Sequence, residues 1–311
     1  MSNIHNIQLG QSRKISYTPF NLRVLSGEYP GNHFYVDGGT GKGGVDGSGA
    51  GTFENPFATL DFAIAFCTAS NGDVIWVKPG HTETTTAIAL DVAGVSIVGL
   101  GVGGAKPTFT ATTAATDLIN VTADDCWIEN LRLVGAASGV TALLDVAADD
   151  FTFVGNDILV GAAPLDIITI ASGDRGRILG NTFIGTAANP DNAIMVQSRT
   201  LDWQIIGNLF NFLEFDIDEN IIDAPANAIP GWVITDNEML GMVLVALTIK
   251  SSVANKFAYM ERNTLVAHAA HTTITELIGT TIEGMFFGGQ NYATDTTKTE
   301  RGARVPLTSP V

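Results

Sequence analysis

A column of aspartates is the feature of this sequence best suited to chemistry. Its members stand five to seven residues before a recurring asparagine, so they occupy equivalent places in successive repeats. Carboxylates stacked on one face could bind Ca²⁺ or supply the acid and base of a glycosidase. Aspartate is also a common turn residue, and the column lapses where Pro230 and Lys256 stand at the corner. We therefore favour the interpretation that these aspartates are turn residues at the corners of the repeats, rather than a metal-binding or catalytic site. The column comprises Asp124, Asp125, Asp149, Asp150, Asp174 and Asp202.

A second acidic group lies in the longest interval between the asparagines, which predicts an outward loop. Loops of this kind often carry function. The sequence EFDIDEN also alternates acidic and apolar residues, as a solvated strand edge does. We favour the strand edge over a metal or catalytic role for Glu214, Asp216, Asp218 and Glu219.

Three further motifs fall short of a site. The loop GGTGKGG lacks the spacing of a phosphate loop and has no Ser or Thr after Lys42, and the lone Asp46 is a poor calcium site. His268 and His271 are close in sequence, but no Cys or acidic neighbour completes a zinc site. We therefore assign no catalytic, cofactor-binding or metal-binding residue and no cofactor, and we leave enzymatic activity open while favouring its absence.

The elements that position these residues follow from seven regularly spaced asparagines. Their intervals are 26, 25, 27, 29, 26 and 28 residues, and most stand near the end of a short apolar run. A drifting period with two or three strands per repeat and no helix between them predicts a right-handed, single-stranded parallel β-helix. Asparagine tolerates the bend and can hydrogen-bond the next asparagine in the stack. The series is Asn130, Asn156, Asn181, Asn208, Asn237, Asn263 and Asn291.

The chain divides into an arm, a rod and a tail. We predict an extended N-terminal arm over residues 1–32, the β-helix over 33–292 and a C-terminal tail over 293–311. Apolar residues at helical spacing predict a short capping helix over residues 56–70, with Asn55 as its N-cap and Pro56 in the first turn. The fold class is therefore all-β with one capping helix.

Composition excludes several partners. The formal charge is −16, which argues against nucleic acid and against anionic membranes. No window approaches the ~20 apolar residues of a membrane span, and the polar start of the chain has no signal-peptide core. Cys67 and Cys126 have largely apolar neighbours, which indicates small core residues rather than a disulfide framework.

Residues 33–101 resemble the opening of phage-encoded and prophage-encoded right-handed parallel β-helix proteins, a pectate-lyase-like fold. The shared motifs are Asp37-Gly38, the Pro-Phe-Ala-Thr run from Pro56, the Gly-Asp-Val strand from Gly72, and Pro-Gly-His ending at His81. The resemblance implies a viral origin. It includes both shell-decorating proteins and tailspikes that cleave polysaccharide, and no motif here transfers the catalytic carboxylates of the tailspikes.

Two functional hypotheses follow. The first is a virion structural protein: a decoration or cement protein of a bacteriophage, located on the capsid surface, bound to the major capsid protein through its terminal arms, and forming a homotrimer. The alternative is a tailspike or tail-fibre type protein that binds or degrades polysaccharide. A weaker variant is a carbohydrate-binding adhesin. Exposed aromatic residues would be needed for it, whereas packing inside apolar strands is expected for Trp76, Trp127, Trp203 and Trp232.

Overall fold

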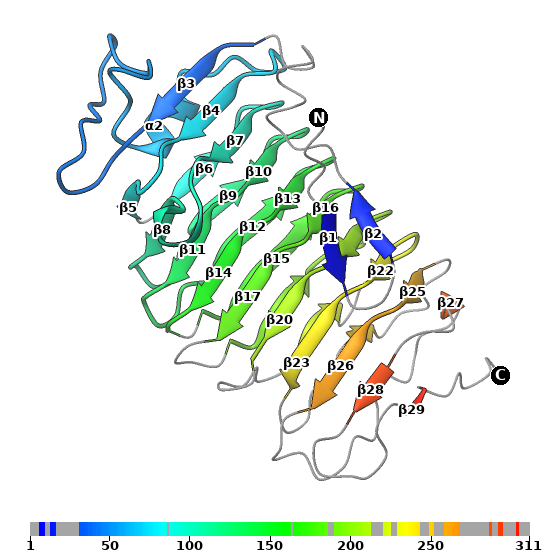
Figure 1. Ribbon diagram of the computed structural model, residues 1–311. Coiled ribbons are helices and arrows are strands. Elements are labelled where there is room, and N and C mark those ends of the chain that lie inside the picture. Colours follow the sequence, from blue (N-terminus) through cyan, green and yellow to red (C-terminus); the bar gives the residue numbers. More distant parts are fainter. Residues whose placement is uncertain are drawn as a thin grey trace.

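The protein is a parallel β-helix in which each coil of the chain adds one strand to each of three sheets (Figure 1). The computed structural model describes residues 6–9, 13–16, 31–85, 87–162, 164–185, 190–212, 220–224, 229–242, 249–251, 258–267, 286–287, 292–294 and 303–304. Along the chain the order is sheet 1, then sheet 2, then sheet 3, and the coil then returns to sheet 1. The structure confirms the prediction of an all-β fold built as a parallel β-helix.

The three sheets have ten, ten and seven strands. Sheet 1 contains β3 (His33–Val36), β4 (Val74–Val77), β7 (Ser96–Gly99), β10 (Trp127–Glu129), β13 (Thr152–Val154), β16 (Arg177–Leu179), β19 (Gln204–Ile206), β22 (Val233–Thr235), β25 (Tyr259–Glu261) and β27 (Phe286–Phe287). Sheet 2 contains β5 (Thr82–Thr85), β8 (Thr108–Ala111), β11 (Arg132–Gly135), β14 (Asp157–Val160), β17 (Thr182–Gly185), β20 (Leu209–Asn211), β23 (Glu238–Met242), β26 (Thr264–Ala267), β28 (Tyr292–Thr294) and β29 (Ala303–Arg304). Sheet 3 contains β6 (Ile88–Leu90), β9 (Ile119–Val121), β12 (Ala142–Ala147), β15 (Asp166–Ser172), β18 (Asn192–Val196), β21 (Asn220–Ala224) and β24 (Ile249–Ser251).

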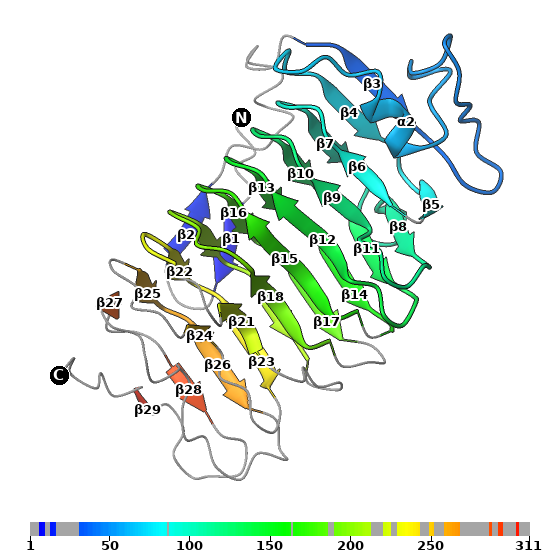
Figure 2. The same ribbon diagram turned by 180° about the vertical axis from the view of Figure 1, so that it is seen from behind.

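Pairing within these sheets is parallel except between β28 and β29. Figure 2 shows sheet 3 from outside, with β6, β9, β12, β15 and β18 following one another along the rod. Within the predicted arm, the structure describes β1 (Asn6–Leu9) and β2 (Arg13–Ser16), which pair antiparallel with each other.

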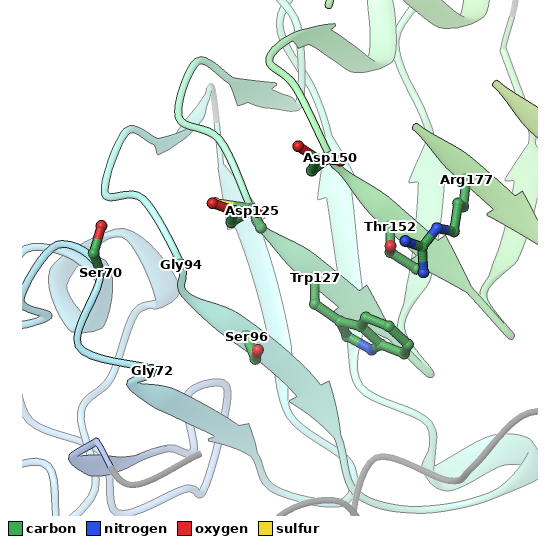
Figure 3. A pocket seen from close by; sticks show the side chains of 10 residues that line it. Ser70, Gly72, Gly94, Ser96, Asp125, Trp127, Asp150, Thr152 and Arg177 are labelled. Atoms are coloured by element: carbon green, nitrogen blue, oxygen red, sulfur yellow. The ribbon is translucent and has the colours of Figure 1, made fainter. Parts of the chain in front are cut away.

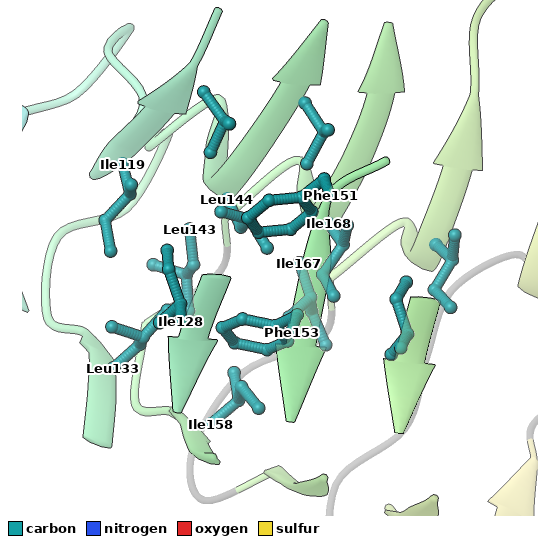
Figure 4. Close-up of a cluster of buried hydrophobic side chains, with 14 of the residues drawn as sticks. Ile119, Ile128, Leu133, Leu143, Leu144, Phe151, Phe153, Ile158, Ile167 and Ile168 are labelled. Carbon is teal, nitrogen blue, oxygen red and sulfur yellow. The ribbon is translucent and has the colours of Figure 1, made fainter. Parts of the chain in front are cut away.

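The core is a column of apolar side chains enclosed by the three sheets (Figure 4). Because strand side chains alternate between faces, one residue in two along most strands points inward and meets its equivalent from the next coil. Phe183 and Phe210 stack in this way with ring centroids 4.5 Å apart, and Trp203 and Trp232 lie 6.0 Å apart. Cys126 is buried and Cys67 half-buried, and both are free thiols. Burial raises the pKa of Cys67 to about 12 and that of Cys126 to about 11, as expected of core residues.

Five asparagines form a continuous hydrogen-bonded ladder at the corner between sheets 1 and 2. They are Asn156, Asn181, Asn208, Asn237 and Asn263. In each step, the backbone N–H and the side-chain amide of one asparagine donate to the Oδ1 of the next. The residue before each ladder asparagine has a left-handed backbone, whether or not it is glycine, as Asp236 and Arg262 show. The series is therefore confirmed as a folding device over these coils.

The prediction that Asn130 belongs to this series is wrong by one residue. The register pairs Glu129 with Val154 and Arg132 with Asp157, which sets Asn130 opposite Gly155 and Leu131 opposite Asn156. Asn130 is itself the left-handed residue of its coil, with φ 58°, and its amide donates to the carbonyls of Gly99 and Gly101. The seventh asparagine, Asn291, lies outside the described residues.

The predicted capping helix over residues 56–70 is not confirmed. The structure has only a five-residue helix, α2 (Leu60–Ile64), and its N-cap is Thr59 rather than Asn55. Phe57 instead forms a parallel β-bridge with Val36. The N–H of Phe57 donates to the carbonyl of Tyr35 at 2.8 Å and the N–H of Asp37 donates to the carbonyl of Phe57 at 2.9 Å, so the start of the segment is extended backbone rather than helix. The carboxylate of Asp46 accepts the backbone N–H groups of Ala58 and Thr59 just before α2 begins. A second short helix, the 3₁₀ turn η1, covers Gly103–Ala105.

The sequence motifs around Gly38 and His81 converge at this end of the rod. The N–H of Gly38 donates to Nδ1 of His81 at 2.7 Å, so Nε2 of that ring faces the carboxylate of Glu83 at 3.3 Å. The same carboxylate accepts the N–H of Leu60 at 2.9 Å, at the start of α2. Both His81 and Glu83 are buried. The motif residues therefore tie the first strand, α2 and the first coil together.

Candidate functional site

The predicted aspartate column lies at the corner between sheets 3 and 1. Asp124, Asp149 and Asp174 each accept, through Oδ1, a backbone N–H from the next coil at 2.8 to 2.9 Å. Asp125, Asp150 and Asp202, each one residue further along in its coil, have left-handed φ angles of 56° to 59°. Both features are those of turn residues that satisfy a bend in the backbone. The structure therefore gives the column the corner role that we favoured.

Arg175 occupies the position in its coil that Asp125 and Asp150 occupy in theirs, and it forms ion pairs with Asp149 and Asp150. Its guanidinium lies 2.9 Å from the Asp149 carboxylate and 2.7 Å from that of Asp150. The backbone N–H of Asp174, together with Arg175, holds the pKa of Asp149 below its ordinary value. A carboxylate held ionised in this way is a poor general acid.

A groove of about 400 Å³ opens beside the same corner, on the outward face of sheet 1 (Figure 3). It extends from the turn before β4, where Ser70 and Gly72 line it, across β7, β10, β13 and β16. Asp125 and Asp150 lie at the corner, and Trp127 and Arg177 lie on the strand face. Ser96 and Thr152 are buried and stand on either side of Trp127 in the register of the sheet. The groove thus combines an aromatic plane with carboxylate, hydroxyl and guanidinium groups.

Two of the four tryptophans depart from the predicted core packing. Trp203 and Trp232 are fully buried inside the rod, as expected. Trp76 and Trp127 instead belong to a separate outer cluster on sheet 1 with Val74 and Val98. The indole N–H of Trp127 donates to Glu129 at 3.1 Å. Ile128 lies between Trp127 and Glu129 in β10 and points into the core. Because side chains alternate along a strand, this pattern could have indicated that Trp127 faces outward.

The remaining predicted candidates have structural partners or lie outside the described residues. Lys42 lies 3.4 Å from Asp37 and donates to the carbonyl of Pro79. The acidic residues 214, 216, 218 and 219 and the histidines 268 and 271 lie outside the described residues. Over the described ranges, no three His, Cys, Asp or Glu side chains gather where they could hold a metal ion. Within the same ranges, no helix is long and apolar enough to cross a bilayer.

Comparisons with known proteins give matches among solved structures only. No protein-family model matches the chain, and no curated protein gives a significant match. Among solved structures, a rhamnogalacturonan lyase is 15% identical with a TM-score of 0.36, over 86% of this chain and 66% of that protein. A pectate lyase is 13% identical with a TM-score of 0.44, over 88% of this chain and 82% of the other. The chain thus spans slightly less than two thirds of the rhamnogalacturonan lyase.

Proposed function

We propose that the groove on sheet 1 binds a neutral polysaccharide. The observation that carries the proposal is the position of Trp127 on the outward face, between the carboxylate of Asp125 and the guanidinium of Arg177. A sugar ring has an apolar C–H face and a rim of hydroxyl groups. An indole plane suits the face, while a carboxylate accepts from the rim and a guanidinium donates to it.

The polar groups of the groove are available to a ligand to different degrees. Asp150 is already paired with Arg175. Within the described part of the chain, neither Asp125 nor Arg177 is in an ion pair. These two side chains are therefore the groups that we expect to contact sugar hydroxyls.

Charge favours a neutral polymer over an acidic one. The chain has a formal charge of −16, and the groove has two carboxylates against one guanidinium of its own. A polyanion approaching this face would meet a repulsive potential. A neutral glycan would not, and its affinity should depend only weakly on salt.

The direction of the groove suits a chain rather than a single sugar. Five successive coils at ~4.8 Å spacing make it about 19 Å long. It is open to solvent on the outward face of the sheet (Figure 3). A polysaccharide could therefore lie along the rod with one ring on Trp127.

Binding is tested by titrating immobilised neutral polysaccharides with the native protein and with Trp127→Ala. Tyr259→Ala is the matched control, because Tyr259 lies on the same outward row, 36% exposed, at a distance from the groove. We expect Trp127→Ala to weaken binding at least about tenfold, which is the loss of roughly 1.4 kcal/mol. Equal binding by both variants would refute the site, and no binding by the native protein to any neutral glycan would refute the function.

The same incubations distinguish binding from degradation. Reducing ends, or unsaturated sugars, should not accumulate if the groove only binds. Their appearance would establish the degrading form of this function. In that case Asp149→Asn and Asp174→Asn should leave activity intact, because both side chains are committed to the corner.

A virion structural role is the second candidate. The hydrogen bonds from Gly38 to His81 and from Leu60 to Glu83 favour it, since they tie the first strand and the start of α2 to the first coil and so stabilise this end of the rod. On this proposal the protein decorates a bacteriophage capsid as a homotrimer. Reconstruction of purified virions tests it, and a location at the tail tip would contradict the capsid assignment.

A further inference from the structure

The outward face of sheet 2 carries a row of apolar side chains that do not belong to the core. In β11, β14, β17 and β23 the second residue points into the core, so the third residue points outward. These outward residues are Val134, Leu159, Ile184 and Leu240, and all four are half-buried. The strands follow one another along the rod (Figure 1), and their pairing aligns the four residues in one row, interrupted by Asn211 of β20.

The apolar residues at equivalent places on sheet 1 are already covered. Val98 and Val154 also point outward from their strands, yet they are only 6% and 0% exposed. The row on sheet 2 instead remains accessible to solvent at each of its apolar residues. Aligned apolar side chains that stay accessible indicate an interaction surface.

The neighbouring row on the same five strands has charges of opposite sign at its two ends. The row consists of Arg132, Asp157, Thr182, Leu209 and Glu238. The carboxylate of Asp157 lies 2.8 Å from Lys106 and 3.4 Å from Arg132, so one acid serves two cations. Glu238 is exposed, and no Lys or Arg of the described residues forms an ion pair with it. The face is therefore positive at β11 and negative at β23.

We propose that two copies of this chain associate through sheet 2 with their rods antiparallel. A two-fold axis along β17 places Ile184 against Ile184 of the second copy, and Val134 against Leu240 of the second copy. The same axis places Arg132 opposite Glu238 of the second copy, and it does so twice. Parallel rods would instead bring like charges to the same height along the rod. Identical subunits commonly form such isologous two-fold interfaces, and charge complementarity fixes their orientation.

The size of the face predicts a reversible dimer. The seven strands from β8 to β26 extend for about 29 Å at ~4.8 Å spacing, and strands of about four residues make the face about 13 Å wide. This is about 400 Å² per copy, which is in the range of weak and transient interfaces. The dimer uses a different face from the groove on sheet 1, and its symmetry differs from that of the homotrimer in the virion proposal.

Sedimentation velocity of the full chain over a range of concentrations tests the proposal, and we expect a monomer–dimer equilibrium. Ile184→Asp places two carboxylates against each other at the two-fold axis and should raise the Kd at least about tenfold. Ile206→Asp is the matched control, because Ile206 is also half-buried and outward but lies on sheet 1. It should leave the Kd unchanged, and circular dichroism should show that both variants are folded.

A charge exchange tests the orientation and leaves the apolar row intact. Glu238→Arg should weaken the dimer, because two guanidinium groups then face each other, and adding Arg132→Glu should restore it. Glu238 is exposed, so its substitution should not disturb the fold.

A native protein that stays monomeric at every soluble concentration overturns the proposal, and so does a trimer. A dimer that survives Ile184→Asp unchanged also overturns it. A double variant that associates no better than Glu238→Arg contradicts the antiparallel arrangement and overturns the proposal in the same way.

Discussion

Removal of one ladder asparagine should cost a large part of the stability of the rod. Asn208 is fully buried, and its side chain makes four hydrogen bonds. Its Oδ1 accepts from the backbone and side-chain amides of Asn181 at 2.9 and 3.1 Å. Its Nδ2 donates to the carbonyl of Ile178 and to Asn237 at 2.9 and 3.0 Å.

In Asn208→Ala the N–H of Asn181 loses its acceptor, and the carbonyl of Ile178 loses this donor. Each buried group left without a partner costs about 1 to 3 kcal/mol. We therefore expect the free energy of unfolding to fall by about 3 to 5 kcal/mol once the small cavity is included. Urea unfolding followed by circular dichroism measures it.

Two further variants are controls. One tests whether the loss of stability comes from lost hydrogen bonds or from lost side-chain volume, and the other tests whether any substitution in this coil is destabilising. Asn208→Leu restores bulk without hydrogen bonds, and it should be about as destabilising as the alanine variant. Gln204→Ala, on the outward side of the same coil, should change stability by less than about 0.5 kcal/mol. A loss below about 1 kcal/mol in Asn208→Ala, or normal stability in Asn208→Leu, would refute the ladder as a stabilising device.

Three shorter predictions concern other sites. Burial raises the pKa of Asp73, but hydrogen bonds from the N–H groups of Thr68 and Asn32 and from Asn71 outweigh it, so the pKa is lowered. The stabilising contribution of the ionised Asp73 should thus be complete above the unfolded pKa of about 3.9 and be lost as pH falls through the folded pKa. Urea unfolding from about pH 6 to pH 2 measures this loss. The free energy of unfolding should fall less steeply with decreasing pH in Asp73→Asn than in the native protein. Gly176→Ala would place a methyl group 2.4 Å from the buried ring of Trp203, so it should cost about 1 to 3 kcal/mol in urea unfolding, whereas Gly47→Ala meets nothing within 4 Å and should be neutral. Trp127→Ala should lose polysaccharide binding in the immobilised-glycan assay while its circular dichroism stays native.

The repeat could be predicted from the sequence because one residue type recurs at one structural position. Asn156 to Asn263 were placed correctly, since each is needed to satisfy backbone groups at the same bend. Asn130 was misplaced because the pattern shows residue type and not register. In that coil the left-handed position holds the asparagine, and Leu131 fills the ladder position. Only the pairing of β10 with β13 distinguishes the two.

The candidate sites depended on contacts that a linear pattern does not contain. The helix over residues 56–70 was overestimated because Phe57 forms backbone hydrogen bonds with Tyr35 and Asp37, which are far away in the sequence, and helical spacing does not show such a contact. The outward placement of Trp76 was missed because all four residues of β4 are apolar, so apolar character did not distinguish the two faces of that strand.

The most direct test of the proposed function is a crystal structure of the protein soaked with the neutral oligosaccharide that binds it best. The proposal predicts a sugar ring against the indole of Trp127, with hydroxyl groups in contact with Asp125 and Arg177. Sugar density on another face of the rod, with the groove on sheet 1 empty, would contradict it.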